Sequence, residues 1–363
     1  MVVVVLTTVF TSCKGGLTPD LDTTKLYPAY STALEKYGYI NQSGEWIIQP
    51  LYDGVSAFSC GYAQVDMAGT NYFINKKGDL QNAMPVDYAD DFYYNYCVVM
   101  LNDNLGMFDK NFQLAVPCLY ADLGEMTEDG LAYATMDGKS YGFVDKKNNF
   151  VIFPQYEAVR SFVDGVAVIL NGDKYGAVNT SGKSVIMPIY DRLRSLGNKR
   201  LGVYDENSNK WGMLTTSGEI KVQYQYDVIS YFTDNNLAMA SLDGENFGYI
   251  DANGSPKIMF QYKQASSFWG GYAWVAMGNM WMVIDTKANV KSYLAKDWAP
   301  ATSFHNGLAL VTDGNGEYRY VTPEGTVIFT WNMGGNKNTS KRSVRVSETA
   351  NEEQIRMGSL AED

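Results

Sequence analysis

The side chains that could do acid–base chemistry are few, and most of them recur along the chain. The sequence has a single histidine, His305, so a catalytic triad would have to use it, and a zinc site built on several histidines is excluded. An acidic residue follows a tyrosine in several similar stretches, as Asp53, Glu157, Asp191 and Asp227. A catalytic carboxylate pair should be unique, so we expect these residues to cap turns and predict no catalytic residue and no enzyme activity.

The cysteines and glycines point to no cofactor or metal. Cys60, Cys97 and Cys118 lack the Cys-x-x-Cys spacing of a zinc site and allow at most one disulfide among themselves. No glycine-rich nucleotide-binding loop precedes a helix, because no helical period is found between residues 36 and 330. The chain has 40 acidic against 29 basic residues and a net charge of −11, which argues against nucleic acid as a partner.

The first 13 residues resemble an export signal. Residues 1–12 form an apolar run that is too short for a bilayer, which takes about 20 residues, but suits a secretory signal. Phe10-Thr11-Ser12-Cys13 resembles a bacterial lipobox, although Phe10 stands where Leu is usual and no basic residue precedes the run. We predict a lipoprotein signal over residues 1–13 with Cys13 lipidated, which would anchor the chain to a membrane. The alternative is a buried first strand with an ordinary core cysteine. Residues 14–35 are expected to form a tether and N-terminal cap.

A short signature recurs at nearly constant spacing. It consists of an apolar residue, then Asn, Asp or Thr, two polar residues and usually Gly, as in Ile40-Asn41-Gln42-Ser43-Gly44. Its second residue stands at positions 41, 75, 109, 145, 179, 215, 251, 285 and 322, so the period is 34–37 residues. Nine occurrences at this spacing indicate tandem structural modules.

The signature has the chemistry of a tight hairpin turn. Asn, Asp or Thr accepts a hydrogen bond from the backbone two residues on, and Gly supplies the left-handed conformation. β-like runs flank the turn, and each copy closes with Phe-x-x-Gly and a further strand, as in residues 58–65, where apolar and polar residues alternate. We predict about eight three-stranded antiparallel modules and a partial ninth at residues 316–330.

Lysine, an aromatic residue and glycine open the first strand of several copies. Lys-Trp-Gly stands at residues 210–212, with relaxed versions at 36–38 and 174–176, whereas Tyr72 and Met282 replace the Gly in the second and eighth copies. On these residues the chain resembles the WG-repeat (KWG-repeat) family of bacterial proteins over residues 36–330. The resemblance implies tandem β modules, often on exported proteins, and supplies no catalytic residues.

One three-stranded module cannot bury its apolar face alone, so neighbouring modules must stack. An open β superhelix and a closed propeller-like ring both satisfy this need. Propeller blades usually have four strands and about 40–50 residues, more than this period provides. We therefore expect an all-β repeat domain over residues 36–330 that forms an open superhelix rather than a ring, followed by a polar C-terminal tail over residues 331–363.

Most aromatic residues occupy repeat positions, which indicates a core. One stretch, residues 268–274, departs from the repeat: Trp269 stands at a polar position and Trp274 at the outward position of the third strand. Exposed Trp often marks a binding surface, so Trp269, Tyr272 and Trp274 are the predicted ligand or partner surface. The alternative is packing between neighbouring modules.

Two functions agree with these observations. The first is a non-catalytic, lipid-anchored scaffold of the cell envelope, at the outer membrane or cell surface, that binds another protein. The second is a surface lipoprotein that binds a glycan on Trp and Tyr platforms. Neither reading involves a cofactor.

Overall fold

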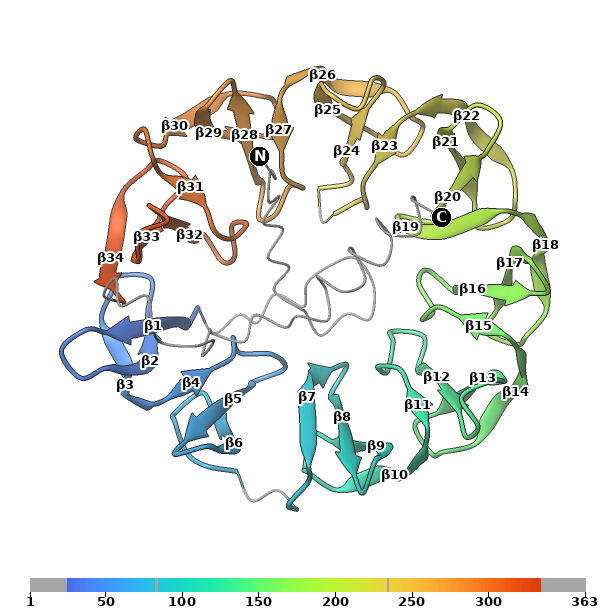
Figure 1. Ribbon diagram of the computed structural model, residues 1–363, viewed down its shortest axis with the longest axis horizontal. Coiled ribbons are helices and arrows are strands. Elements are labelled where there is room, and N and C mark those ends of the chain that lie inside the picture. The colour runs from blue at the N-terminus through green and yellow to red at the C-terminus, as the bar shows by residue number, and fades with distance from the viewer. Residues whose placement is uncertain (1–24, 82–83, 234, 334–363) are drawn as a thin grey trace. The chain divides into compact units, whose positions relative to one another are not determined.

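The computed structural model describes residues 25–81, 84–233 and 235–333, and these residues form antiparallel β-sheets (Figure 1). Nine sheets follow one another along this part of the chain, each built from strands that are consecutive in sequence. We call them blades 1 to 9. Blades 1 and 2 have three strands and blades 3 to 9 have four. Within the described ranges, no helix is long and apolar enough to cross a membrane.

The chain divides into two compact units. Among the described residues, unit 1 holds blades 1, 2, 8 and 9, and unit 2 holds blades 3 to 7. The strands of unit 1 are β1 (Tyr27–Ser31), β2 (Lys36–Ile40) and β3 (Trp46–Tyr52) in blade 1; β4 (Gly54–Val55), β5 (Tyr62–Met67) and β6 (Thr70–Asn75) in blade 2; β27 (Gln264–Ala265), β28 (Tyr272–Met277), β29 (Met280–Asp285) and β30 (Val290–Tyr293) in blade 8; and β31 (Ala299–Pro300), β32 (Ala309–Thr312), β33 (Glu317–Val321) and β34 (Val327–Asn332) in blade 9.

Unit 2 has five four-stranded blades. Its strands are β7 (Tyr88–Tyr93), β8 (Tyr96–Leu101), β9 (Asn104–Asp109) and β10 (Leu114–Tyr120) in blade 3; β11 (Asp122–Leu123), β12 (Leu131–Thr135), β13 (Tyr141–Asp145) and β14 (Phe150–Tyr156) in blade 4; β15 (Ala158–Val159), β16 (Val166–Asn171), β17 (Lys174–Asn179) and β18 (Ser184–Tyr190) in blade 5; β19 (Arg192–Gly197), β20 (Arg200–Asp205), β21 (Lys210–Thr215) and β22 (Ile220–Tyr226) in blade 6; and β23 (Val228–Ile229), β24 (Ala238–Ser241), β25 (Phe247–Ile250) and β26 (Pro256–Tyr262) in blade 7.

The prediction of three strands per module is wrong for most blades. The missed strand has only two residues in several of them, as in β15 and β23, and it follows the last strand of the preceding blade after a single residue. A two-residue strand has no detectable alternation of apolar and polar residues. Because the additional strand is only two residues long in several blades, a period of 34–37 residues, which is short for a propeller blade, still provides four strands.

The expected open superhelix is also wrong, because the fold is a nine-bladed β-propeller in which blade 9 packs on blade 1 within unit 1. Strand β34 lies beside β1 (Figure 1). The Thr32 hydroxyl donates to the carbonyl oxygen of Asn332 at 3.0 Å, and the Tyr320 hydroxyl donates to that of Pro28 at 2.9 Å. In an open superhelix the first and last modules would not touch.

We call the interface between two neighbouring blades a seam. At the seam between blades 9 and 1, a turn glycine contacts the preceding blade as it does at other seams. A side-chain carbon added to Gly182, in the turn before β18, would lie 3.3 Å from Ile152 of the preceding blade, and one added to Gly78 would lie 3.3 Å from Ile48. The same addition to Gly44 of blade 1 would lie 2.6 Å from the carbonyl oxygen of Ile328 in blade 9. Each of these three turn glycines thus rests on the outer strand of the preceding blade, so blade 9 contacts blade 1 in the same way as blade 1 contacts blade 2 and blade 4 contacts blade 5.

The turn chemistry predicted from the signature is confirmed. The Asn41 side-chain oxygen accepts the amide of Ser43 at 2.9 Å, and that of Asn179 accepts the amide of Ser181 at 3.1 Å. Gly44, Gly182 and Gly218 have φ of 81°, 79° and 88°, which is the left-handed region.

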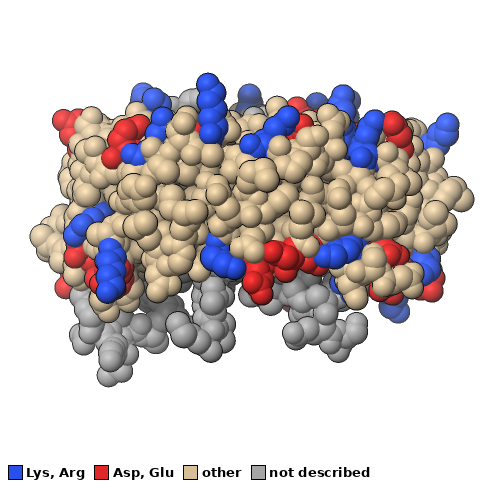
Figure 2. Space-filling view, turned by 90° about the horizontal axis from the view of Figure 1, so that it is seen from above, with Lys and Arg blue, Asp and Glu red and all other residues tan. Residues whose placement is uncertain are grey.

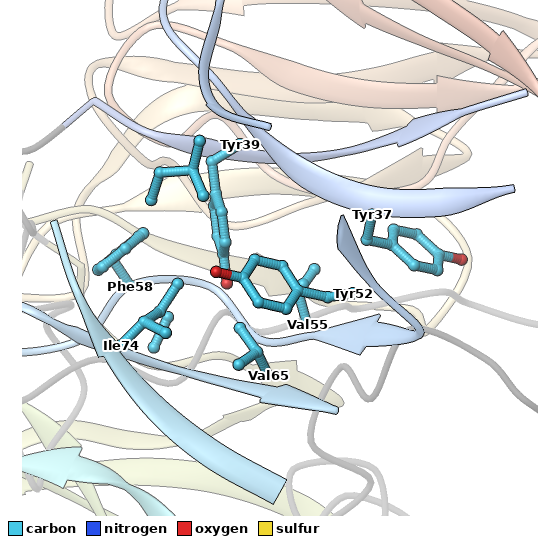
Figure 3. Close-up of a cluster of buried hydrophobic side chains, with 9 residues drawn as sticks. Tyr37, Tyr39, Tyr52, Val55, Phe58, Val65 and Ile74 are labelled. Carbon is cyan, nitrogen blue, oxygen red and sulfur yellow. The ribbon is translucent and has the colours of Figure 1, made fainter. Parts of the chain in front are cut away.

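Apolar side chains fill the spaces between neighbouring blades. Figure 3 shows one cluster, in which Tyr39 and Tyr52 of blade 1 lie against Val55, Phe58 and Val65 of the blade 2 segment. The rings of Tyr39 and Phe58 are 4.8 Å apart. The Phe of Phe-x-x-Gly is therefore a core residue, which agrees with its recurrence.

The glycine of the Lys-Trp-Gly motif lies beneath a bulge of the outer strand. A side-chain carbon on Gly142 would lie 2.4 Å from the carbonyl oxygen of Ile152, and one on Gly176 would lie 2.6 Å from that of Ile186. The register of β13 with β14 and of β17 with β18 shifts at this point. Only glycine leaves room for the bulged backbone.

Two strands lie near the expected domain boundaries. β1 lies inside the segment 14–35 expected as tether and cap, and it pairs with β2 from Tyr27↔Ile40 to Ser31↔Lys36. β34 extends to Asn332, two residues past the expected end of the repeat domain. The predicted signal, Cys13 and most of the C-terminal tail lie outside the described residues.

Candidate functional site

Trp274, predicted to face outward, is instead a core residue. It is 2% exposed, its indole nitrogen donates to the carbonyl oxygen of Thr302 at 3.0 Å, and its ring stacks on Phe304 at 5.1 Å. Blade 9 covers the face of β28 that an isolated strand would leave open, which is the packing alternative named above. A glycan cannot stack on this ring.

Trp269 and Tyr272 are only partly buried. They form a tight turn in which the amide of Trp269 donates to the carbonyl oxygen of Tyr272 at 2.9 Å, and the reverse bond is 3.1 Å long. The two residues between them, Gly270 and Gly271, have φ of 56° and 88°. A ligand or partner surface at Trp269 and Tyr272 remains a prediction.

The repeated carboxylates pair with the lysine of the motif and accept backbone amides. Lys210 Nζ lies 2.8 Å from Asp227 Oδ2, and Lys36 with Asp53 and Lys174 with Asp191 form the same ion pair. Asp53 also accepts the amide of Ala68 at 3.0 Å. Glu157 accepts the amide of Gly172 at 3.1 Å. These contacts agree with the structural role that their recurrence predicts.

His305 lies in the Phe-x-x-Gly turn of blade 9. Its amide donates to the carbonyl oxygen of Leu308 at 2.8 Å, and its Nε2 is 3.1 Å from the Asn306 side-chain nitrogen. The carbonyl oxygen of the adjacent Asn306 accepts the Tyr27 hydroxyl at 2.7 Å. The turn that carries the histidine thus takes part in the seam between blades 9 and 1.

Cys97 and Cys118 are free thiols. Burial, followed by the nearby Asp90 and Asp91, raises the pKa of Cys97 well above its usual value, which keeps the thiol protonated and unreactive. Within residues 25–81, 84–233 and 235–333, no three His, Cys, Asp or Glu side chains are placed to hold a metal ion.

Sequence reasoning missed a row of exposed apolar side chains on the outer strands of unit 2. Phe153 of β14, Met187 of β18 and Met259 of β26 occupy equivalent positions and are 71%, 65% and 67% exposed. Ile189 of β18 is 64% exposed. The sequence contains a signal for these residues. Positions 153, 187 and 259 are apolar, whereas the equivalent position of blade 6 has the polar residue Gln223, as expected for a side chain that faces solvent.

Acidic and basic side chains are interspersed on the face of the molecule drawn in Figure 2. The net charge of −11 is therefore not gathered into one acidic area on that face.

The sequence matches one family model. The model, described as "WG containing repeat", matches residues 37–70, 106–139, 141–175, 175–204, 211–245 and 247–281. Each match begins at or next to the motif of one of the six blades that carry the glycine beneath the bulge. A search of curated proteins found no match.

Solved structures resemble the chain in fold. One described as the crystal structure of the eukaryotic initiation factor is 10% identical, with a TM-score of 0.61, and the match covers 85% of this chain and 95% of that one. This likeness supports the fold alone. BamB from Moraxella catarrhalis is 9% identical at a TM-score of 0.39, covering 70% and 85% of the two chains. The dihydro-heme d1 dehydrogenase NirN is 11% identical at a TM-score of 0.45, covering 86% and 78%.

Proposed function

The chain belongs to the WG-containing repeat family, and from this premise we propose that it is a non-catalytic scaffold of the cell envelope that binds another protein. The observation that carries the proposal is the row of exposed apolar residues on the outer strands of unit 2, Phe153, Met187, Ile189 and Met259. Large apolar side chains that repeat at equivalent exposed positions favour a protein partner, because their burial releases water.

Site-specific crosslinking tests this surface. A photoreactive phenylalanine at position 153 should capture one defined partner in cells, and Met187→Ser should reduce the yield, because the two side chains occupy equivalent positions on neighbouring blades. The same photoreactive residue at position 173 is the control, since Asp173 is exposed in the turn between β16 and β17 and does not lie on an outer strand. Equal capture of the same partner from both positions, or none from position 153, would contradict the proposal.

The envelope location is proposed from residues 1–13 alone. If Cys13 is lipidated, Cys13→Ser should release the protein from the membrane fraction or block its maturation. Cys118→Ser is a suitable control, because Cys118 is a free thiol within the propeller. Membrane partitioning that is unchanged in Cys13→Ser would contradict a lipid anchor.

The alternative proposal is a glycan-binding lipoprotein that uses Trp269 and Tyr272, the two aromatic residues of the predicted surface that stay partly accessible. Saturable binding to cell-wall polysaccharide that is lost in Trp269→Ala would favour it. The burial of Trp274 counts against it, because a sugar platform of three rings is reduced to two. This is why the protein partner is our first proposal.

A further inference from the structure

Arginines gather on one hairpin of blade 6. Of the five arginines in the described residues, Arg192 and Arg194 lie on β19 and Arg200 begins β20. Arg192 and Arg194 are two residues apart on one strand, so their side chains leave the same face of the sheet, with Cα atoms roughly 7 Å apart. Two like charges are thereby held close together in a protein whose net charge is −11.

The two guanidinium groups lie over two neighbouring aromatic rings. The Arg192 guanidinium carbon is 5.0 Å from the centre of the Tyr204 ring, and that of Arg194 is 4.1 Å from the centre of the Trp211 ring. Tyr204 and Trp211 are paired across β20 and β21, with ring centres 5.2 Å apart. Tyr231 of blade 7 lies 5.8 Å from Arg194. The aromatic rings fix the position of both cations.

The repeat shows what this position holds elsewhere. In blades 2, 7 and 8 the residue equivalent to Arg194 is Ser56, Ser230 or Ser266. The serine hydroxyl there accepts a backbone amide of the adjacent strand, from Gln64 at 3.0 Å, Met239 at 2.8 Å and Trp274 at 3.0 Å. Blade 5 has an arginine, Arg160, at this position, but only blade 6 adds a second one, Arg192, where blade 2 has Gly54. Blade 6 therefore lacks the serine hydrogen bond found in blades 2, 7 and 8 and carries two arginine charges instead.

Arg194 is incompletely satisfied. Its Nη2 donates to the carbonyl oxygen of Ile229 at 2.5 Å, while its Nε is buried without a hydrogen-bond partner. Burial lowers its pKa, and the opposing influence comes from Tyr231, not from a carboxylate. Arg319 forms an ion pair with Glu317. Among the described residues, neither Arg192 nor Arg194 forms an ion pair with an acidic side chain. A buried donor without a hydrogen-bond partner destabilises the folded state, and more so when it is charged.

We propose that Arg192 and Arg194 form a phosphate-binding site on the Tyr204–Trp211 platform. The two guanidinium charges match a dianionic phosphate, whose oxygens suit the planar donor pattern of arginine. The phosphate would supply the negative charge that no acidic side chain in the described part of the chain supplies to these two arginines. Its oxygens would accept a hydrogen bond from Arg194 Nε, which has no partner there. This site goes beyond the proposed scaffold function and does not depend on it.

NMR of the arginine side-chain Nε–Hε groups in the full chain tests the site, with inorganic phosphate as the probe at constant ionic strength and pH 7.5. The Arg194 resonance should shift in a saturable manner. Arg319 is an internal control, because it lies 4.0 Å over Trp298 and already pairs with Glu317, so its resonance should not move. Acetate, a monoanion, should bind more weakly.

Arg192→Gln should weaken phosphate binding by about tenfold or more, since one charge-assisted interaction is lost. The variant retains Arg194 on the rings, and a thermal melt establishes that it folds. The proposal is overturned if the Arg194 shift is linear, is matched by acetate, or is unchanged in folded Arg192→Gln, since each of these results indicates screening only.

Discussion

The blades of unit 2 and unit 1 differ in how they attach their outer strand. All five blades of unit 2 have glycine at the third position of the Lys-Trp-Gly motif, at Gly106, Gly142, Gly176, Gly212 and Gly248, and all carry a seven-residue outer strand. In unit 1 only blade 1 has it, as Gly38. Blades 2, 8 and 9 have Tyr72, Met282 and Arg319 there.

The outer strands follow this difference. Blade 2 has no fourth strand among the described residues, and β30 of blade 8 has only four residues. In blade 9 the residues of β33 and β34 pair one to one past Arg319↔Thr330, with a single register shift near the turn. The glycine is thus required by the bulge in the outer strand, and a blade without that bulge accepts a side chain.

The largest expected effect comes from filling the space beneath the bulge. Gly142→Ala places a carbon 2.4 Å from the Ile152 carbonyl oxygen and 2.7 Å from the Pro154 nitrogen. Because both are backbone atoms, we expect a loss of about 3 kcal/mol or more in the free energy of unfolding, measured by urea denaturation.

Gly54→Ala is the control, since its added carbon would meet only the Asp66 Cβ at 3.6 Å. Its urea midpoint should match that of the parent protein. Similar midpoints for the two variants would show that the bulge does not require glycine.

The turn glycines, which both units share, should give the next largest effect. Gly182 has a φ of 79°, and an added carbon would lie 3.3 Å from Ile152. Gly182→Val should therefore cost about 1–3 kcal/mol, because a β-branched residue resists positive φ. Lys183→Val, one residue on and exposed, should be nearly neutral. If urea denaturation gave equal losses, backbone conformation would not be the cause.

The seam between blades 9 and 1 should be sensitive to alkaline pH. Burial raises the pKa of Tyr27 to about 12, and its hydroxyl donates to Asn306. The unfolded tyrosine ionises near pH 10, so this stabilisation is fully present below about pH 10 and is lost as the pH rises towards 12. Tyr27→Phe should cost about 1 kcal/mol at neutral pH and flatten the loss of stability above pH 10.

Thermal melts from pH 8 to 11.5 measure both effects. Tyr293→Phe, at an exposed tyrosine of the same unit, serves as the control and should keep the slope of the parent protein. If the melting temperature of Tyr27→Phe falls with pH as steeply as that of the parent protein, Tyr27 is not a source of the alkaline sensitivity.

The smallest effect is expected for the ion pair of the motif lysine. Lys210 and Asp227 are partly exposed, at 29% and 30% of their side-chain area. A double-mutant cycle with Lys210→Met and Asp227→Asn should give a coupling of about 0.2–1 kcal/mol that falls with added salt. A coupling energy above this range that does not change with salt would contradict the interpretation of Lys210 and Asp227 as a solvent-exposed ion pair.

The candidate site was only partly predictable. The structural role of Asp53 and Asp227 followed from their recurrence, and their contacts agree with it. The outward position assigned to Trp274 followed the alternation of β28, but the neighbouring blade covers that face, and strand periodicity does not say which faces a neighbour will cover. The arginine pair escaped notice because Arg192 and Arg194 are ordinary surface residues until Tyr204, Trp211 and Tyr231 are brought beside them.

The sequence by itself determined the period, the hairpin turns, the all-β class and the family, because each depends on residues within one module. Asn179 and Gly182 specify their turn through hydrogen bonds and a φ that involve only a few neighbouring residues. Whether blade 9 meets blade 1 was decided only by the tertiary structure. That contact joins Thr32 and Asn332, which are 300 positions apart in the sequence. No pattern within a single module specifies such a contact, and two-residue strands such as β15 leave no periodic signal.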